Sequence, residues 1–133
     1  MNLPCPVLLV THPGLGEGLL EAAEAILGER PNIDHLSNEG LSPDELGRRV
    51  DEWLGVHTGS ALILTDLGFG SCCQTVRRVT RDRGTVGIVA GVNLPVVLAT
   101  VRSRDLDDLR KLLEHLGDRG RESLELYLGG QRI

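Results

Sequence analysis

The sequence predicts an α/β fold: a four-stranded parallel sheet flanked by helices on both faces, with a further helix at the C-terminal end. Short apolar runs alternate with segments of helical periodicity, which is the pattern of repeated βαβ units. The runs are continuous in apolar residues, as in strands buried on both faces. The chain has 133 residues, of which 41% are hydrophobic and 25% charged. This size and composition indicate a single domain over residues 1–133.

The first strand is predicted at Val7–Thr11, an apolar run that Pro13 and Gly14 bring to an end. From Leu15 the apolar residues recur at helical spacing, and Gly28 provides a stop signal. The first βα unit is therefore predicted to end at Gly28.

The second strand, Asn32–Leu36, is weaker and is predicted near a sheet edge. Ser42, with Pro43 next and Glu45 three residues on, predicts a capped helix start with a capping box. Ser60–Asp66 is predicted to be the third strand, ending in a carboxylate.

Residues 71–74 form a second possible capping box, opening a helix through about Arg81. Thr85–Ala90 is predicted to be the fourth strand, and Asn93 to cap the helix after it. The final helical stretch is predicted over Leu109–Tyr127.

A sheet of this kind is predicted to have the strand order 2-1-3-4, with right-handed crossovers. That order reverses direction between the first and third strands, and ligands bind beyond the carboxyl ends at such a point. His12 follows the first strand and Asp66 ends the third. The two residues are therefore predicted to lie on either side of the switch point.

Charge and composition argue against several classes of partner. The net charge is −5, and one Trp, one Tyr and one Phe are the aromatic residues, so binding to nucleic acid is not expected. No apolar run approaches the roughly 18–20 residues of a membrane helix, so direct membrane insertion is not expected. The first residues lack the features of a signal peptide. Three cysteines without a Cys-x-x-Cys spacing indicate a reduced, cytoplasmic protein.

A histidine beside a carboxylate can act as a nucleophile, because the carboxylate fixes the imidazole tautomer and leaves the second ring nitrogen free. Asp66 is predicted to do this for His12. Gly70 and Ser71 open a helix whose free N–H groups can bind a phosphoryl group. The pattern alone slightly favours the alternative, a loop histidine and a turn acid without chemical roles, because Asp and His are common at strand ends.

Other residues carry weaker signals. Cys72 and Cys73 at a helix start are candidates for a lowered thiol pKa, which leaves a redox or metal role open, but ordinary packing of small residues is favoured. A group of arginines is either a solvated face or a docking surface for an acidic or phosphorylated partner: Arg77, Arg78, Arg81 and Arg83. The remaining histidines are predicted to be structural or exposed, and no pair has zinc-ligand spacing: His35, His57 and His115.

A dinucleotide-binding loop is a weaker alternative. Gly14, Gly16 and Gly18 follow a strand, and Asp34 comes about 20 residues later. The third glycine is one position early for G-x-G-x-x-G.

The chain resembles the enzyme IIA domain of the mannose-type sugar phosphotransferase system. The likeness covers essentially the whole chain and is carried by Val10–Gly16, Leu64–Ser71, Ala90–Pro95 and Gly120–Glu122, with Gly-Val-Asn-Leu-Pro as its most specific piece. Departures from the family pattern are Pro13, Phe69 and Cys72, because the family usually has Gly after the histidine and Gly-Gly-Ser-Pro-x-Asn after the aspartate.

The resemblance implies a cytoplasmic phosphotransferase with a phosphohistidine intermediate, in sugar transport or its regulation. His12 would accept the phosphoryl group, and Asp66 would orient the His12 ring. Ser71 with Gly70 would bind the phosphoryl oxygens. Expected partners are the phosphocarrier protein HPr, a IIB component and a second copy in a homodimer, without a metal or organic cofactor. A non-catalytic regulatory module on the same fold is the second hypothesis.

Overall fold

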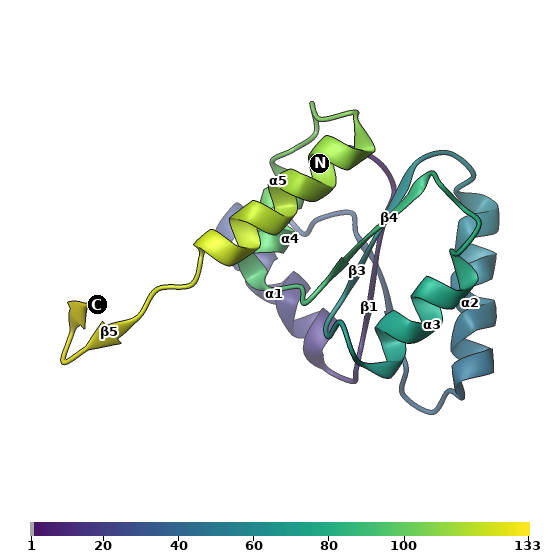
Figure 1. Ribbon diagram of the computed structural model, residues 1–133, viewed down its shortest axis with the longest axis horizontal. Coiled ribbons are helices and arrows are strands. Elements are labelled where there is room, and N and C mark those ends of the chain that lie inside the picture. Colours follow the sequence, from purple (N-terminus) through teal and green to yellow (C-terminus); the bar gives the residue numbers. More distant parts are fainter. Residues whose placement is uncertain (1) are drawn as a thin grey trace.

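A computed structural model describes residues 2–133 of the chain (Figure 1). The predicted alternation of strands and helices is confirmed, and a small hairpin follows it. In chain order the elements are β1 (Val7–Thr11), α1 (Leu15–Leu27), β2 (Asp34–Ser37), α2 (Pro43–Val56), β3 (Ala61–Thr65), α3 (Ser71–Val79), β4 (Val86–Ala90), α4 (Leu94–Val101), α5 (Leu109–Glu122), β5 (Tyr127–Leu128) and β6 (Gln131–Arg132).

The main sheet has the order β2-β1-β3-β4, and all its neighbouring strands are parallel. Every residue of the central strands β1 and β3 is buried, as their continuous apolar sequences predict. The more polar β2 lies at one edge, where its Asp34 is exposed. It begins two residues later than predicted, at Asp34, and ends at Ser37. The predicted strand order is confirmed.

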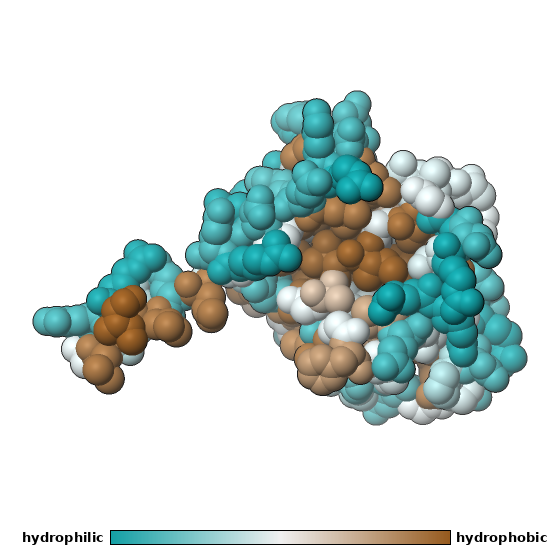
Figure 2. Space-filling model, in the orientation of Figure 1, coloured by the Kyte–Doolittle hydropathy of each residue, from teal (hydrophilic) through white to brown (hydrophobic). Residues whose placement is uncertain are grey.

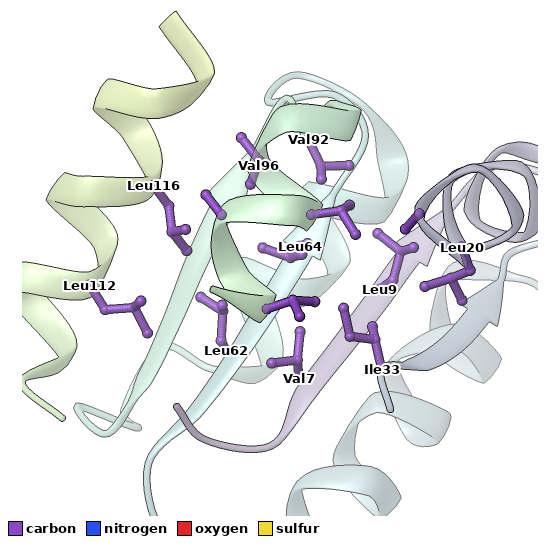
Figure 3. Packing of buried hydrophobic residues seen from close by; sticks show 14 residues of the cluster. Val7, Leu9, Leu20, Ile33, Leu62, Leu64, Val92, Val96, Leu112 and Leu116 are labelled. Carbon is purple, nitrogen blue, oxygen red and sulfur yellow. The ribbon is translucent and has the colours of Figure 1, made fainter. Parts of the chain in front are cut away.

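Helices cover both faces of the sheet (Figure 1). On one face, side chains of β1 and β3 such as Leu9 and Leu64 pack with residues of α1, α4 and α5, including Leu20 and Leu116 (Figure 3). On the other face, Leu8, Val10 and Ile63 pack with α2 and α3 through Leu46, Val50, Leu54 and Val76. Burying a side chain of this size is worth about 1.5–3 kcal/mol. The two apolar layers hold the strand ends of the sheet in place.

Two predicted helix caps are confirmed. The Ser42 side chain accepts a hydrogen bond from the Glu45 amide at 3.2 Å, with Pro43 in the first helical position. Its hydroxyl also lies 3.2 Å from Oε1 of Glu45. The Asn93 side chain accepts from the Val96 amide at 2.9 Å and begins α4.

The predicted capping box at residues 71–74 is wrong. Gly70 is the N-cap of α3 and has no side chain to accept a bond, while Ser71 is already helical. The Gln74 amide donates to the Gly70 carbonyl, and the Gln74 side chain reaches the Phe69 carbonyl at 3.5 Å. The helix ends at Val79, two residues before the predicted Arg81.

The last predicted helix is too long. It ends at Glu122, and residues 123–133, here named the C-terminal arm, extend away from the domain (Figure 1). The arm ends in an antiparallel hairpin in which Tyr127 pairs with Arg132. Gly129 and Gly130 form its turn with φ of 60° and 80°, a backbone conformation that favours glycine. Alternating Leu124, Leu126 and Leu128 before two glycines is a hairpin signal, which the helical interpretation overlooked.

In the part of the chain that the structure describes, no helix is both long and apolar enough to cross a membrane. All three cysteines are free thiols.

Candidate functional site

His12 and Asp66 meet at the carboxyl ends of the two central strands. Nδ1 of His12 lies 2.7 Å from Oδ2 of Asp66, and the His12 backbone N–H donates to the same oxygen at 2.9 Å. The Asp66 side chain is 5% exposed, whereas that of His12 is 43% exposed. The predicted juxtaposition is confirmed. The hydrogen bonds to Asp66 hold the His12 imidazole in place, and its exposed side lets a partner reach it from solvent.

The electrostatics of Asp66 keep it ionised. Burial raises the pKa of the Asp66 carboxyl, but hydrogen bonds from the His12 amide and ring, with the attraction of that ring, outweigh burial and leave the pKa below its ordinary value. An ionised carboxylate can only accept hydrogen bonds. The proton between the two groups is therefore carried by Nδ1, and the lone pair lies on Nε2.

The turn after β1 is built by glycines and a threonine. Gly14 is the N-cap of α1 with φ of 83°, which glycine adopts without steric cost. The Gly16 amide donates to the buried Thr11 hydroxyl at 3.0 Å, and that hydroxyl donates to the His12 carbonyl at 2.9 Å. A Cβ on Gly16 would lie 2.3 Å from Cδ2 of His35. Close packing thus requires glycine at position 16.

These contacts argue against the dinucleotide interpretation. The Gly16 amide is already occupied by Thr11. Asp34 pairs with Leu8 in the sheet, near the start of β1, and its Oδ2 accepts a 2.7 Å hydrogen bond from Nε1 of Trp53. A ribose-binding acid belongs at the carboxyl end of the sheet, where the glycine turn lies.

The N-terminus of α3 is close in sequence to Asp66 and faces the carboxyl end of the sheet. The first amides of a helix, those of residues 71–73, have no acceptor within the helix. Gly70 donates its own amide to the Leu67 carbonyl at 3.3 Å, so its part is that of an N-cap. Ser71 is exposed. That these residues bind a phosphoryl group stays a prediction.

The sequence did not predict that Cys72 lies beside His12 and Asp66. Ligand atoms of His12, Asp66 and Cys72 all lie within 4.8 Å of one another, a group that could hold a metal ion. Burial raises the pKa of the Cys72 thiol to about 11, and the charges of Asp66 and Cys73 add to the shift. The predicted lowering of the Cys72 pKa is therefore wrong, because desolvation and a neighbouring carboxylate outweigh the helix N-terminus. The signal available was its position one residue inside the helix that follows Asp66.

The other sequence candidates lie apart from this pair. His35 is a partly buried residue of β2, with Nδ1 3.4 Å from Oε1 of Glu17. His57 is the C-cap of α2, and its ring packs against that of Trp53 in a tilted arrangement, with ring centroids 4.5 Å apart. His115 is an exposed residue of α5.

The four arginines at the end of α3 and just after it differ in their contacts. Arg78 pairs with Asp44 at 3.7 Å and Arg83 with Asp51 at 2.9 Å, both across to α2. Arg77 and Arg81 line a surface groove beside Ile88 of β4, which Arg78 also lines. Arg78 and Arg83 pair with acids of α2, and Arg77 and Arg81 remain candidates for a docking surface.

Exposed apolar side chains border the site. Leu15 begins α1, and Leu67 and Phe69 stand in the turn after Asp66; all three are exposed, Phe69 to 82%. Among the described residues only glycines have a positive φ, so Phe69 is accommodated without backbone strain. Its ring lies at the surface and leaves the His12 imidazole open.

Comparisons with known proteins agree with this geometry. The mannose-specific EIIAB component of the phosphotransferase system of Escherichia coli K12 is 29% identical over 126 residues, covering 90% of this chain and 39% of that protein. The chain thus spans about two fifths of that relative's length. The sorbose-specific EIIA component of Lacticaseibacillus casei is 30% identical over 115 residues, covering 83% of this chain and 81% of that protein.

A solved structure shares the fold. The mannose/sorbose-specific IIA subunit from Enterococcus faecalis superposes with a TM-score of 0.82 at 20% identity, covering 96% of each chain. The family model EIIA-man, described as the PTS system fructose IIA component, matches residues 6–116. With the sheet order, the His12–Asp66 pair and this match in agreement, the chain belongs to the EIIA-man family of phosphotransferase-system IIA components.

Proposed function

We propose that the chain is a phosphoryl-transfer protein of the sugar phosphotransferase system, with His12 as the covalent acceptor. The observation that carries the proposal is the 2.7 Å contact between Nδ1 of His12 and Oδ2 of Asp66, combined with a half-exposed ring. It supplies an oriented nucleophile that a macromolecular donor can reach. The donor is HPr in its phosphohistidine form, as the family membership suggests.

In the proposed step, the N–P bond of the donor phosphohistidine breaks as a new N–P bond forms to Nε2 of His12. The Nδ1 proton stays on the ring, and Asp66 stabilises the positive charge that develops there. The reaction is an in-line displacement, in which positioning and electrostatics supply most of the catalysis. In transfer onward to a IIB component, the Nε2–P bond of His12 breaks as a bond forms between phosphorus and the nucleophile of the IIB component, and the lone pair returns to Nε2.

The phosphoryl oxygens are assigned to the start of α3. Three amides at residues 71–73 without helical acceptors, together with the positive end of the helix dipole, favour a dianionic group. The Ser71 hydroxyl adds a further donor. Gly70, as N-cap, sets the direction in which these amides point.

The surroundings of His12 support a protein partner. Leu15, Leu67 and Phe69 expose large apolar surfaces in the segments that follow His12 and Asp66. Exposed apolar patches beside polar groups are typical of protein interfaces. We assign this rim to HPr and, in turn, to the IIB component. Free thiols throughout the chain agree with action in the reducing cytoplasm.

The proposal is tested by incubating the purified chain with phosphoenolpyruvate, enzyme I and HPr. Intact mass spectrometry is expected to show one added phosphoryl group per chain, and none when HPr is left out. No addition, under conditions that phosphorylate another IIA protein, would instead establish a non-catalytic regulatory module.

The proposed active form is a homodimer. The C-terminal arm exposes Leu124, Tyr127 and Leu128 and extends away from its own domain (Figures 1 and 2). Strand β4 is the edge strand at the end of the sheet opposite β2, so one of its two sides has no neighbouring strand. Figure 2 shows exposed apolar side chains in this region. A groove of about 350 Å³ lies there, lined by residues of β4, α4 and α5 that include Val89 and Leu113. We assign it to the arm of a second copy.

Leu128→Asp is expected to convert the dimer to a monomer, because a carboxylate would replace the apolar side chain that is assigned to the apolar part of the groove around Val89 and Leu113. Light scattering coupled to size-exclusion chromatography gives the mass. Gln131→Asp, at the position paired with Leu128 in the hairpin, is the matched control and should remain dimeric. A monomeric parent chain, or a dimeric Leu128→Asp variant, would contradict the assignment.

A further inference from the structure

Cys72 adds a third metal-binding group to the His12–Asp66 pair. The three side chains come from different segments: the residue after β1, the residue after β3 and the first turn of α3. Their ligand atoms lie within 4.8 Å of one another. Cys72 and Asp66 are buried, and His12 is half-exposed. The group therefore forms a three-sided cluster with one side open to solvent.

One oxygen of this cluster is left without a partner. Oδ2 of Asp66 accepts both hydrogen bonds from His12, whereas Oδ1 is buried and has no hydrogen-bond partner among the described residues. Buried polar atoms are nearly always satisfied, and an exception calls for an explanation such as an ion. The phosphoryl-transfer role of Asp66 uses Oδ2 and does not account for Oδ1. This observation is independent of the spacing of the three residues.

The donor set decides which cation fits. A thiolate, an imidazole nitrogen and a carboxylate are the ligands of Zn²⁺, whereas Mg²⁺ and Ca²⁺ take oxygen ligands. Three protein ligands with an open fourth position is an arrangement found in zinc sites that exchange their last ligand. At Zn–N and Zn–O distances of about 2.0–2.2 Å and Zn–S of about 2.3 Å, tetrahedral ligand atoms lie roughly 3.3–3.6 Å apart. Spacings of up to 4.8 Å must therefore shorten by up to about 1.3 Å, and the 2.7 Å contact between Nδ1 of His12 and Oδ2 of Asp66 must open.

We propose that the unphosphorylated chain binds one Zn²⁺ ion through His12, Asp66 and Cys72. Binding displaces the thiol proton of Cys72 to solvent. The ion binds Nδ1 of His12 and the unpartnered Oδ1 of Asp66, so the hydrogen bond that joins the two side chains opens and the Nδ1 proton is replaced by a proton on Nε2, exchanged through water. Water or an anion completes the fourth position, on the side where His12 is exposed. The cation site stands on the cluster alone and does not depend on phosphoryl transfer.

A consequence does rest on the proposed function: Zn²⁺ and the phosphoryl group exclude one another. With the ion on Nδ1, the ring proton is on Nε2, so the lone pair that would accept the phosphoryl group is absent, and the ion also occupies the carboxylate that orients the ring. Zinc binding is therefore an inhibitory input to phosphorylation, and phosphorylation releases the ion.

Cation binding is measured by isothermal titration of the metal-free, unphosphorylated full chain with ZnCl₂, and with Co²⁺ as an optical probe. One equivalent should bind, and Co²⁺ should show the near-ultraviolet charge-transfer band of a thiolate ligand. Cys72→Ser should weaken Zn²⁺ binding by at least about 100-fold, since even the loss of an outer-shell group costs about 10–100-fold. Cys73→Ser is the matched control: Cys73 is the equally buried neighbour outside the cluster, and this variant should bind as the parent does.

Binding that is unchanged in Cys72→Ser, or a parent chain that takes up no Zn²⁺, would overturn the proposal. Far-ultraviolet circular dichroism checks that the variant folds. If it does not, His12→Gln serves instead, because its half-exposed side chain is not part of the core. The two hypotheses fail separately. Zinc uptake without phosphorylation by HPr rejects phosphoryl transfer alone, and phosphorylation without zinc uptake rejects the cation site alone.

Discussion

Replacing His12 with glutamine is expected to abolish phosphorylation by HPr and to leave the fold intact. The amide of glutamine is polar but not a nucleophile, so no phosphoryl group can be accepted. The His12 side chain is 43% exposed and stands outside both apolar layers, so thermal unfolding should change little. Intact mass spectrometry and a circular dichroism melting curve measure the two effects.

The matched control is His115→Gln, which changes an exposed histidine on α5 and should be phosphorylated as the parent is. The label on the parent chain should be lost in acid and persist in base, as expected of a phosphoramidate. A label that remains on the His12→Gln variant, or that survives acid, would place the phosphoryl group on another residue, with Ser71 the first to test.

Asp66→Asn is expected to slow transfer from phospho-HPr by up to about 10⁴-fold without abolishing it. Loss of an orienting carboxylate has an effect of that size at the histidine of serine proteases, where the wrong imidazole tautomer results. The neutral amide removes the charge that stabilises the developing imidazolium beside it. Its oxygen can still accept the His12 backbone N–H, which Asp66 now binds at 2.9 Å, so the turn should keep its shape. A single-turnover rate by rapid quench measures the effect, and transfer at the parent rate would refute the orienting role.

The same substitution should change the dependence of stability on pH. The pKa of Asp66 is lower in the folded chain than its ordinary value, so its ionised form stabilises the fold. That contribution is present above the pKa of the unfolded state and is lost as the pH falls through the folded-state pKa. In urea unfolding, the free energy of unfolding of the Asp66→Asn variant should therefore fall less than that of the parent chain between neutral and acidic pH.

Local signals in the sequence were sufficient for most of the fold. The continuous apolar runs at Val7–Thr11 and Ala61–Thr65 can only be stable when both faces are covered, so they identify the central strands. Ser42 and Asn93 mark helix starts because their side chains satisfy amides three residues on. Parallel strands with right-handed crossovers leave few arrangements, so the sheet order, and with it the meeting of His12 and Asp66, followed from the order of the elements.

Other features required the tertiary structure. Whether the chain beyond Glu122 continues as a helix or leaves the domain depends on what covers its leucines, which helical spacing alone does not reveal. The pKa of the Cys72 thiol also depends on the tertiary structure. A helix start lowers a thiol pKa, but burial beside Asp66 raises it to about 11, because desolvation depends on packing from elements distant in the sequence. The sequence thus determined the four strands of the main sheet, the five helices around it and their order, but not the C-terminal hairpin. The distances and burial around His12, and the third group that Cys72 adds to it, were decided by packing.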